Sequence, residues 1–262
     1  MVKNNIGNPK KFIKKKNYLI TASDLFHINY ISELNKVLNF KKIDIICEIG
    51  QGFGLLASKL LKIKKFKIIL IDLPESNFIT SFFLKKNYPN KNIILDSDLP
   101  ERKLTKEILK RGDIFIISPW ILIDQFKIDL FINSRSMMEM NMKSINNYFR
   151  LIEKKISYNG YFLCINRYYK DLVGYPIEFH RYPYSNVWRT IVSKKSWKQS
   201  HIHFLLTQKV NQKNSNIQKS LKEIKQTYIQ LVKTDKFIIR RLLPINIYRT
   251  YKIIKNFFLN FK

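Results

Sequence analysis

Short apolar runs alternate with amphipathic stretches along the first 208 residues. Residues 22–38 carry apolar side chains near helical spacing, and short runs rich in Ile, Leu and Phe then recur between polar segments. The expected strands are Ile43–Ile49, Lys67–Ile71, Asn92–Leu95, Ile114–Ile117, Leu130–Ile132 and Tyr161–Ile165. The expected helices between them are Leu55–Lys62, Phe78–Asn87, Leu104–Lys110 and Ser144–Ile156. Strands that alternate with helices predict an α/β fold with a mostly parallel sheet and helices on both faces.

The pattern changes near the end of this region. Trp188–Val192 and His201–Gln208 predict an antiparallel pair that closes the sheet. Residues 217–236 predict a charged helix, and residues 246–261 predict a basic amphipathic helix with apolar side chains at spacings of three and four. We therefore divide the chain into a basic N-terminal segment (1–21), a main domain (22–208) and a basic helical extension (209–262).

The chain is strongly basic. Its 262 residues include 48 Lys and Arg against 19 Asp and Glu, which gives a formal net charge of +29, and 45% of the residues are hydrophobic, as expected for a globular protein. Lys, Ile and Asn are all abundant, which AT-rich coding DNA produces, so we interpret the charge mainly as a property of the surface. An anionic membrane or nucleic acid remains an alternative, but no RNA-recognition, zinc-finger or helix-turn-helix motif is present, and we predict no nucleic-acid partner.

The sequence favours a cytoplasmic location. No apolar run approaches the roughly 20 residues that a membrane span needs, and no apolar segment follows the N-terminal lysines as in a signal peptide. Cys47 and Cys164 lie in apolar runs, where they are expected to be small buried side chains in a reducing compartment.

A glycine-rich turn follows the first buried strand. Gly50, Gly52 and Gly54 can adopt positive φ and let a ligand approach the backbone, and Asp72 ends the next strand about 20 residues later, where a carboxylate can hold both hydroxyls of a ribose. Glu48 would repel a pyrophosphate. A ligand with a ribose and a cationic end fits better, and S-adenosylmethionine has both. The alternative is a turn that only packs a helix against a strand.

Several segments resemble one known family. The runs EIGQGFG, IDLPE, DLFINSRSMMEM and INR are similar to the sugar O-methyltransferase family, a group of class I S-adenosylmethionine-dependent enzymes associated with bacterial surface-polysaccharide genes. The resemblance extends from about residue 20 to 208 and includes Pro183–Trp188 and His201–His203. Gln51 departs from the family, which usually has a smaller residue there. The resemblance does not cover the last part of the chain.

The resemblance implies a Rossmann-like class I methyltransferase fold and S-adenosylmethionine as cofactor. It implies that the glycines pass under the methionine part, that Ser118 to Trp120 lie beside the adenine, and that Asn133 faces cofactor and acceptor. The cofactor-binding set expected from the glycine turn and the resemblance is Glu48, Gly50, Gly52, Gly54, Asp72, Leu73, Ser118, Trp120 and Asn133.

Methyl transfer to a sugar hydroxyl needs a group that takes the hydroxyl proton. Glu139 is the first candidate, because three neighbouring methionines would raise its pKa; alternatively it caps the following helix. His180 is the second candidate, in an aromatic segment suited to stacking on sugar rings. Asn166 and Arg167 follow a strand and are predicted to bind the acceptor, with a loop-anchoring role as the alternative. We predict no metal site, and we expect the other three histidines, His27, His201 and His203, to be packing or surface groups.

These features together predict a cytoplasmic S-adenosylmethionine-dependent O-methyltransferase. Its acceptor would be a glycan or an activated sugar, linked to a nucleotide or a lipid. The basic helix at 246–261 could hold the enzyme at the anionic inner membrane. Two alternatives stay open: a nucleic-acid methyltransferase, which would explain the charge, and a non-catalytic Rossmann-like module.

Overall fold

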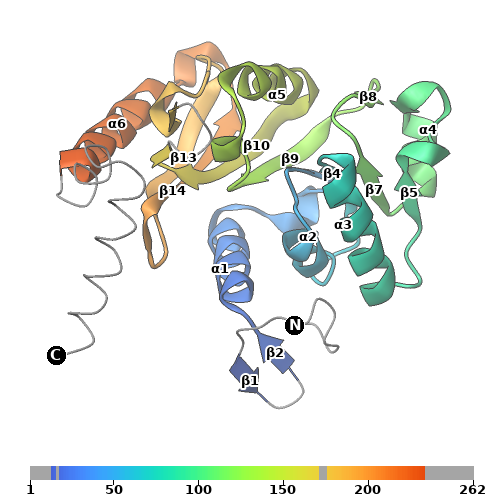
Figure 1. Cartoon of the computed structure of the whole chain (residues 1–262). Helices are drawn as coiled ribbons and strands as arrows, with labels where there is room; N and C mark the ends of the chain where they lie inside the picture. The colour runs from blue at the N-terminus through green and yellow to red at the C-terminus, as the bar shows by residue number, and fades with distance from the viewer. Residues whose placement is uncertain (1–12, 16–17, 171–175, 234–262) are drawn as a thin grey trace.

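The computed structural model describes residues 13–15, 18–170 and 176–233. Its centre is an eight-stranded sheet in the order β13-β14-β10-β9-β3-β4-β7-β5 (Figure 1). In that order the strands are Trp188–Ser196, Gln199–Lys209, Ile156–Arg167, Ile128–Ser134, Ile45–Ile49, Lys67–Ile71, Ile114–Ile117 and Ile93–Leu95. The strands from β10 to β5 run parallel to one another, whereas β14 is antiparallel to both β10 and β13. This confirms the predicted Rossmann-like sheet, mostly parallel with a C-terminal antiparallel pair.

Helices cover both faces of the sheet. They are α1 (Ala22–Val37), α2 (Leu55–Leu60), α3 (Pro74–Asn87), α4 (Lys106–Arg111), α5 (Met142–Lys155) and α6 (Ile217–Lys233). Buried side chains of α1, α2 and α3 join one core cluster, and those of α4, α5 and α6 join the other. Figure 1 shows α1, α2 and α3 together on one side, with α5 and α6 on the opposite side. The central strands are apolar almost throughout because both of their faces are covered.

Short elements complete the described chain. The short strands are β1 (Ile13–Lys15), β2 (Tyr18–Ile20), β6 (Lys103–Leu104), β8 (Leu122–Ile123), β11 (Tyr169–Lys170) and β12 (Ile177–Glu178). The 3₁₀ turns are η1 (Phe40–Lys42), η2 (Asp96–Asp98), η3 (Pro100–Arg102), η4 (Met137–Glu139), η5 (Phe179–Arg181) and η6 (Gln212–Asn214). β1 and β2 form an antiparallel pair inside the basic N-terminal segment 1–21.

Helix starts follow ordinary capping chemistry. Thr21 caps α1, because its side chain accepts from the backbone N–H of Asp24 at 3.1 Å while the Asp24 carboxylate accepts from the backbone N–H of Thr21 at 2.8 Å. Asn141 caps α5 by accepting from the N–H of Ser144 at 2.8 Å. α3 begins at Pro74, a residue suited to the first helical position, and so starts four residues before the helix that apolar spacing predicted.

The Asn159-Gly160 pair, a sequence signal typical of turns, lies within a strand. β10 already begins at Ile156, and its pairing with β9 shifts register between Ile156 and Tyr161. Asn159 has φ +60°, a conformation that Asn tolerates better than most residues. The Asn-Gly signal therefore marks a bulge in a long strand instead of a loop between two elements.

α6 begins the segment that we expected to be a separate extension. Its side chains Ile217, Leu221 and Ile224 are buried in the core cluster shared with α4 and α5. The helix confirms the prediction for the described part of 217–236, and this part is continuous with the main core. The amphipathic helix expected at 246–261 lies outside the described residues. Within the described ranges, no helix is both long and apolar enough to cross a membrane.

Candidate functional site

The glycine turn lies where neighbouring parallel strands end together. β3 ends at Ile49 and pairs with β4 on one side and with β9 on the other. The chain leaves β3 toward β4, so the order of connections reverses between β3 and β9. In open α/β sheets such a reversal opens a crevice at the carboxyl ends of the strands, where ligands bind.

The three glycines of the turn serve different purposes. All have positive φ, at +72° for Gly50, +58° for Gly52 and +84° for Gly54. A Cβ on Gly50 would lie 1.9 Å from the Oγ of Ser136, and one on Gly54 would lie 3.0 Å from Thr80 Cγ2. A Cβ on Gly52 would meet no described atom within 4 Å. Gly50 and Gly54 therefore allow close packing within the protein, whereas Gly52 presents its backbone to open space.

Asp72 is joined to this turn by its carboxylate. One oxygen accepts from the N–H of Gly52 at 2.9 Å, and the other accepts from the N–H of Leu73 at 2.8 Å. A carboxylate oxygen can accept more than one hydrogen bond, and the Asp72 side chain is only partly buried. Leu73, 58% exposed, flanks it at the surface. Asp72 is thus held in place, and its carboxylate oxygens can still accept hydrogen bonds from the two hydroxyls of a diol.

Glu48 is a buried acid directly before the turn. Burial, and next the charge of Asp72, raise the pKa of Glu48 to about 8, although a hydrogen bond from the backbone of Ala57 opposes the shift. Its Oε2 atom is buried and has no hydrogen-bond partner among the described residues. A buried carboxyl oxygen without a donor is costly, so this position favours a ligand that brings a donor or a positive charge.

Gln51, the departure from the family pattern, joins the turn to α3. Its amide nitrogen donates to Asn77 Oδ1 at 2.8 Å, and the Asn77 amide donates to the carbonyl of Asp72 at 3.0 Å. The Thr80 hydroxyl donates to the carbonyl of Gly52. These bonds hold the turn and Asp72 in a set arrangement. Sequence reasoning missed Asn77 and Thr80, although polar residues three apart on the buried face of a helix are a usable signal.

The loop after β7 is held by an acid that the sequence analysis did not single out. The N–H of Ser118 donates to Asp96 Oδ1 at 2.9 Å, and the Ser118 hydroxyl donates to the other oxygen of the same carboxylate. Ser118 is buried and acts as an anchor. Trp120 is 53% exposed, so its indole ring is open to a ligand.

Asn133 and Asn166 form a buried amide pair. The Asn133 amide nitrogen donates to the carbonyl of Ile49 at 2.9 Å, and its oxygen accepts from Asn166 at 2.8 Å and from the N–H of Met137 at 3.2 Å. Asn166 also accepts from the N–H of Met138 at 3.1 Å. Both side chains are fully buried. The predicted contacts of Asn133 with cofactor and of Asn166 with acceptor are therefore not supported, because the amides connect the strand ends to one another.

Glu139 does not have the surroundings that we expected. Its side chain is 59% exposed and its carboxylate pairs with Lys170 at 2.6 Å. Met137 and Met138 are buried beneath it, and the following helix is capped by Asn141. The apolar surroundings that we expected around Glu139 are absent, and so is the alternative capping role.

His180 lies against α6. Its ring stacks on Tyr228 with centroids 5.4 Å apart, and its Nε2 lies 3.7 Å from the carboxylate of Glu178, which also accepts from the Tyr228 hydroxyl at 2.9 Å. Burial lowers the pKa of His180. These contacts give it a packing role and do not support its prediction as a base. His203, hydrogen-bonded to Tyr168 and Ser193, is a packing group as predicted.

Tyr148 on α5 is a further neighbour of the turn. Burial, and next the charge of Asp72, raise the pKa of its phenol to about 12. Tyr148 is partly buried and packs against the core cluster that contains α5. The sequence offers no signal for this, because the residue is one of several aromatic residues on an amphipathic helix.

Arg135 and Arg167 leave the ends of the next two strands. Arg135 follows β9 with φ +67°, and its N–H donates to the carbonyl of Ile165 at 2.7 Å. Arg167 ends β10 opposite Ile202 of β14. The sequence analysis predicted Arg167 as an acceptor ligand but missed Arg135.

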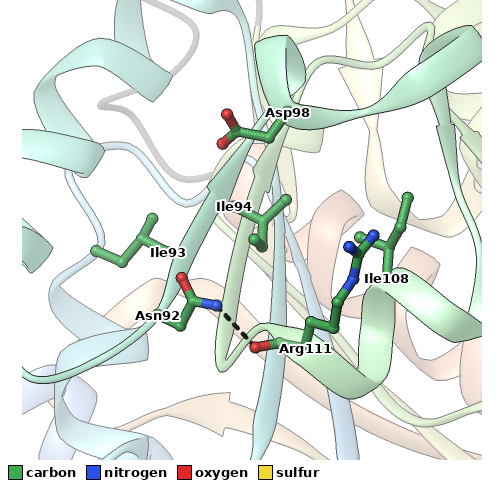
Figure 2. Close-up of a pocket in the computed structure, with 6 residues that line it drawn as sticks. All are labelled: Asn92, Ile93, Ile94, Asp98, Ile108 and Arg111. Carbon is green, nitrogen blue, oxygen red and sulfur yellow. Dashed lines mark hydrogen bonds between the residues drawn. The ribbon is translucent and has the colours of Figure 1, made fainter.

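A cavity of about 450 Å³ lies elsewhere, between edge strand β5 and α4 (Figure 2). Its lining residues are Asn92, Ile93, Ile94, Asp98, Ile108 and Arg111. Figure 2 shows the Asn92 amide donating to the backbone oxygen of Arg111, a bond of 2.8 Å between two of the lining residues. None of the predicted site residues lines it. In the part of the chain with described positions, no group of three or more His, Cys, Asp or Glu side chains could hold a metal ion.

No protein-family model matches the sequence, and no curated protein matches it. Solved structures with a similar fold include mitomycin 7-O-methyltransferase MmcR (11% identity, TM-score 0.47), with 71% of this chain and 55% of that chain covered. Human N-acetylserotonin methyltransferase in complex with SAM gives 16% identity and a TM-score of 0.47, over 72% and 53%. Magnesium protoporphyrin IX methyltransferase from Synechocystis PCC 6803 with bound SAM has 9% identity and a TM-score of 0.46, with 70% of this chain and 79% of that chain covered. The chain spans about half the length of the first two. These TM-scores lie below 0.5, so the similarities carry no conclusion about this chain.

Proposed function

We propose that this protein is an S-adenosylmethionine-dependent O-methyltransferase that methylates a sugar hydroxyl of a surface glycan or its precursor. One observation carries the cofactor assignment: the turn combines an open backbone at Gly52 with two acids, Asp72 at its rim and Glu48 behind it. Such a turn favours a cationic nucleoside over a nucleoside polyphosphate.

The groups present fit this cofactor. Asp72 would hold the ribose hydroxyls, the backbone at Gly52 would lie against the ligand, and Glu48, whose Oε2 lacks a donor, would face its cationic amino-acid end. A pyrophosphate would bring negative charge against the Asp72 carboxylate and would offer the buried Glu48 carboxyl no positive charge. When bound, S-adenosylmethionine supplies a methyl group on a sulfonium, which an oxygen nucleophile can accept.

The protein's own contribution is to hold the acceptor. The acceptor oxygen must be positioned about 3 Å from the methyl carbon and in line with the leaving sulfur. The sheet edge next to the turn provides the groups for this: Arg135 and Arg167 at the ends of β9 and β10. The choice of a sugar rests on the resemblance of the segments around residues 133–140 and 183–188. A peripheral position at an anionic membrane through residues 246–261 is part of the same proposal.

Isothermal titration calorimetry with S-adenosylmethionine tests the cofactor. The wild-type protein should bind, and Asp72→Ala should weaken binding by about a hundredfold, because two hydrogen bonds to a charged acceptor are lost. The matched control is Asp44→Ala, which removes an exposed aspartate that precedes β3 at the opposite edge of the sheet. Undiminished affinity of Asp72→Ala, or no binding by the wild type, would overturn the assignment.

The acceptor class is tested by formation of S-adenosylhomocysteine. Nucleotide-linked sugars, lipid-linked sugars and single-stranded nucleic acid are offered separately to the full chain. Turnover with a sugar acceptor alone supports the proposal. Turnover with nucleic acid alone would replace it by the nucleic-acid methyltransferase that the net charge of +29 had left open.

A further inference from the structure

The outer side of α3 is apolar, although the opposite side of this helix already packs into the core. Phe83 and Leu84 are buried in the core cluster that contains α1 and α2. Phe78, Ile79 and Phe82 form an apolar outer face, and all three are exposed, Phe78 by 75%. A helix that is apolar on both sides is normally covered on both sides. The apolar outer face of α3 therefore indicates a partner outside the described residues.

This face is continuous with the candidate cofactor site. Phe53, at the centre of the glycine turn, is partly exposed, and its ring packs edge-on against that of Phe83 with centroids 5.1 Å apart. Leu73, the residue after Asp72, is exposed where α3 begins. Figure 1 shows α3 beside α2, the helix that follows the glycine turn. Exposed apolar side chains therefore extend from the rim of the site along α3.

Lysines border the apolar outer face. Lys85 and Lys86 are exposed near the end of α3, and the Lys86 ammonium group lies 5.7 Å from the centre of the Phe82 ring. The ion pairs found among the described residues include neither lysine. The acid of this helix, Glu75, lies at the other end, in the first turn. The face thus combines apolar side chains with positive charge that the described acids do not neutralise.

This combination favours a membrane over a protein surface. The centres of protein interfaces are depleted of lysine, and two copies of a chain with a net charge of +29 repel each other. An anionic bilayer accommodates aromatic and aliphatic side chains at its interface and attracts lysines at the same time. An anionic lipid surface therefore suits both the apolar side chains and the lysines of this face.

We propose that the apolar outer face of α3, together with Lys85 and Lys86, docks on an anionic membrane surface. The glycine turn then lies at the lipid surface, because it contacts α3 through Phe53. The acceptor is accordingly a sugar carried by a lipid of that membrane, a conclusion that rests on the proposed function. This contact is separate from the one proposed for residues 246–261.

Cosedimentation of the full chain with vesicles of phosphatidylcholine and phosphatidylglycerol tests the docking. Phe78→Ser combined with Phe82→Ser should weaken binding about ten- to a hundredfold, because two apolar side chains no longer enter the lipid interface. The matched control combines Tyr158→Ser, 72% exposed at the start of β10, with Ile229→Ser on α6. Unchanged affinity of the phenylalanine pair, or an equal loss in the control pair, would overturn the proposal.

The lysines are tested in the same assay. Lys85→Gln combined with Lys86→Gln should weaken binding about ten- to thirtyfold, because lysines near an anionic surface contribute directly to the attraction. Lys143→Gln combined with Lys154→Gln removes the same charge from exposed positions on α5, on the other side of the sheet, and should weaken binding less than about threefold. An equal loss in both pairs would reduce the attraction to net charge and contradict a specific face.

A fluorophore on the face separates a membrane from a second copy of the chain. Cys47 and Cys164 are fully buried, so an environment-sensitive dye labels Phe78→Cys selectively. Anionic vesicles should shift its emission to shorter wavelength, whereas the dye on Tyr158→Cys should not respond. A shift that follows protein concentration without lipid, and no shift with vesicles, would replace the membrane by self-association and overturn the proposal.

The docking face and the proposed function fail separately. S-adenosylmethionine affinity of the Phe78→Ser and Phe82→Ser double variant should equal that of the wild type. A loss would indicate a folding defect, and the Lys85 and Lys86 pair then decides. If the wild type docks through α3 but does not bind S-adenosylmethionine, the docking face stands and the proposed function fails. If it docks and binds the cofactor but methylates only water-soluble sugars, the lipid-linked acceptor is overturned.

Discussion

The glycine turn and the neighbouring ends of β9 and β10 occupy the same edge of one sheet, yet they treat polar residues differently. At the turn, Asp72 is held by backbone N–H groups and keeps capacity for a ligand, and Gly52 faces open space. At the strand ends, Asn133 and Asn166 are fully buried and bonded to each other. The position of a polar side chain at the carboxyl end of a strand is therefore not sufficient to make it a ligand-binding group.

The difference has a structural reason. The turn belongs to one strand-turn-helix unit, so its backbone can bind a ligand while α2 and α3 support it. The ends of β9 and β10 must also connect to the end of β3, and the amide pair makes that connection. The Ser136 hydroxyl donates to the carbonyl of Ile49 at 3.1 Å and lies where a Cβ on Gly50 would be. The ends of β9 and β10 thus support the backbone of the glycine turn from below Gly50.

The largest expected effect breaks the amide pair. Asn133→Ala should lower the free energy of unfolding by about 4 kcal/mol, because it leaves several buried hydrogen-bonding groups without partners. Urea unfolding measures this, and Asn147→Ala, at an exposed position of α5, should change stability by less than about 0.5 kcal/mol. If the two variants are equally stable, Asn133 does not support the site in the way described.

A smaller effect tests the buried acid of the turn. The folded protein raises the pKa of Glu48 from 4.5 to about 8, so between these pH values the folded state binds more protons than the unfolded state. As pH rises through this window, the wild type should therefore lose the stability that protonated Glu48 contributes. The loss should be complete above pH 8. Glu48→Gln removes that contribution, so its stability relative to wild type should increase with pH by on the order of a few kcal/mol.

Unfolding measured across this pH range gives the slope directly. Glu75→Gln, an exposed position in the first turn of α3, should keep the wild-type slope. A wild-type slope in Glu48→Gln would mean that Glu48 is not protonated near neutral pH. Because a cationic ligand favours the ionised acid, affinity for S-adenosylmethionine should rise with pH in the same window for wild type and not for Glu48→Gln.

The smallest effect concerns Glu139. Exposed ion pairs contribute about 0–1 kcal/mol, so Glu139→Ala should barely change stability. Turnover should change by less than about threefold, since its pairing with Lys170 at the surface gives it no catalytic environment. Lys170→Ala should behave alike. A fall in turnover of a hundredfold in Glu139→Ala alone would restore Glu139 as the base.

Much of the fold could be predicted because its signals are local. The run Ile45–Ile49 is apolar except for Glu48 because both faces of the central strand are covered, and the glycines that directly follow it mark the turn. The Asn-Gly pair at 159–160 is a local signal for a turn, yet the positive φ of Asn159 serves a bulge within β10 equally well. α6 was separated from the domain because its charged face dominates its composition, whereas a narrow apolar face enters the core.

In the candidate site, too, the features with local signals could be predicted from the sequence, and the long-range contacts could not. The sequence carried the order of strands and helices, the glycine turn and the acid at the end of β4, because each is encoded by residues close together in the chain. The tertiary structure decided which polar groups are available: Asn133 is hydrogen-bonded to Asn166, Ser118 to Asp96, and the backbone N–H of Arg135 to the end of β10. These partners come from distant parts of the chain, and a hydrogen bond that the fold already uses is not available to a ligand.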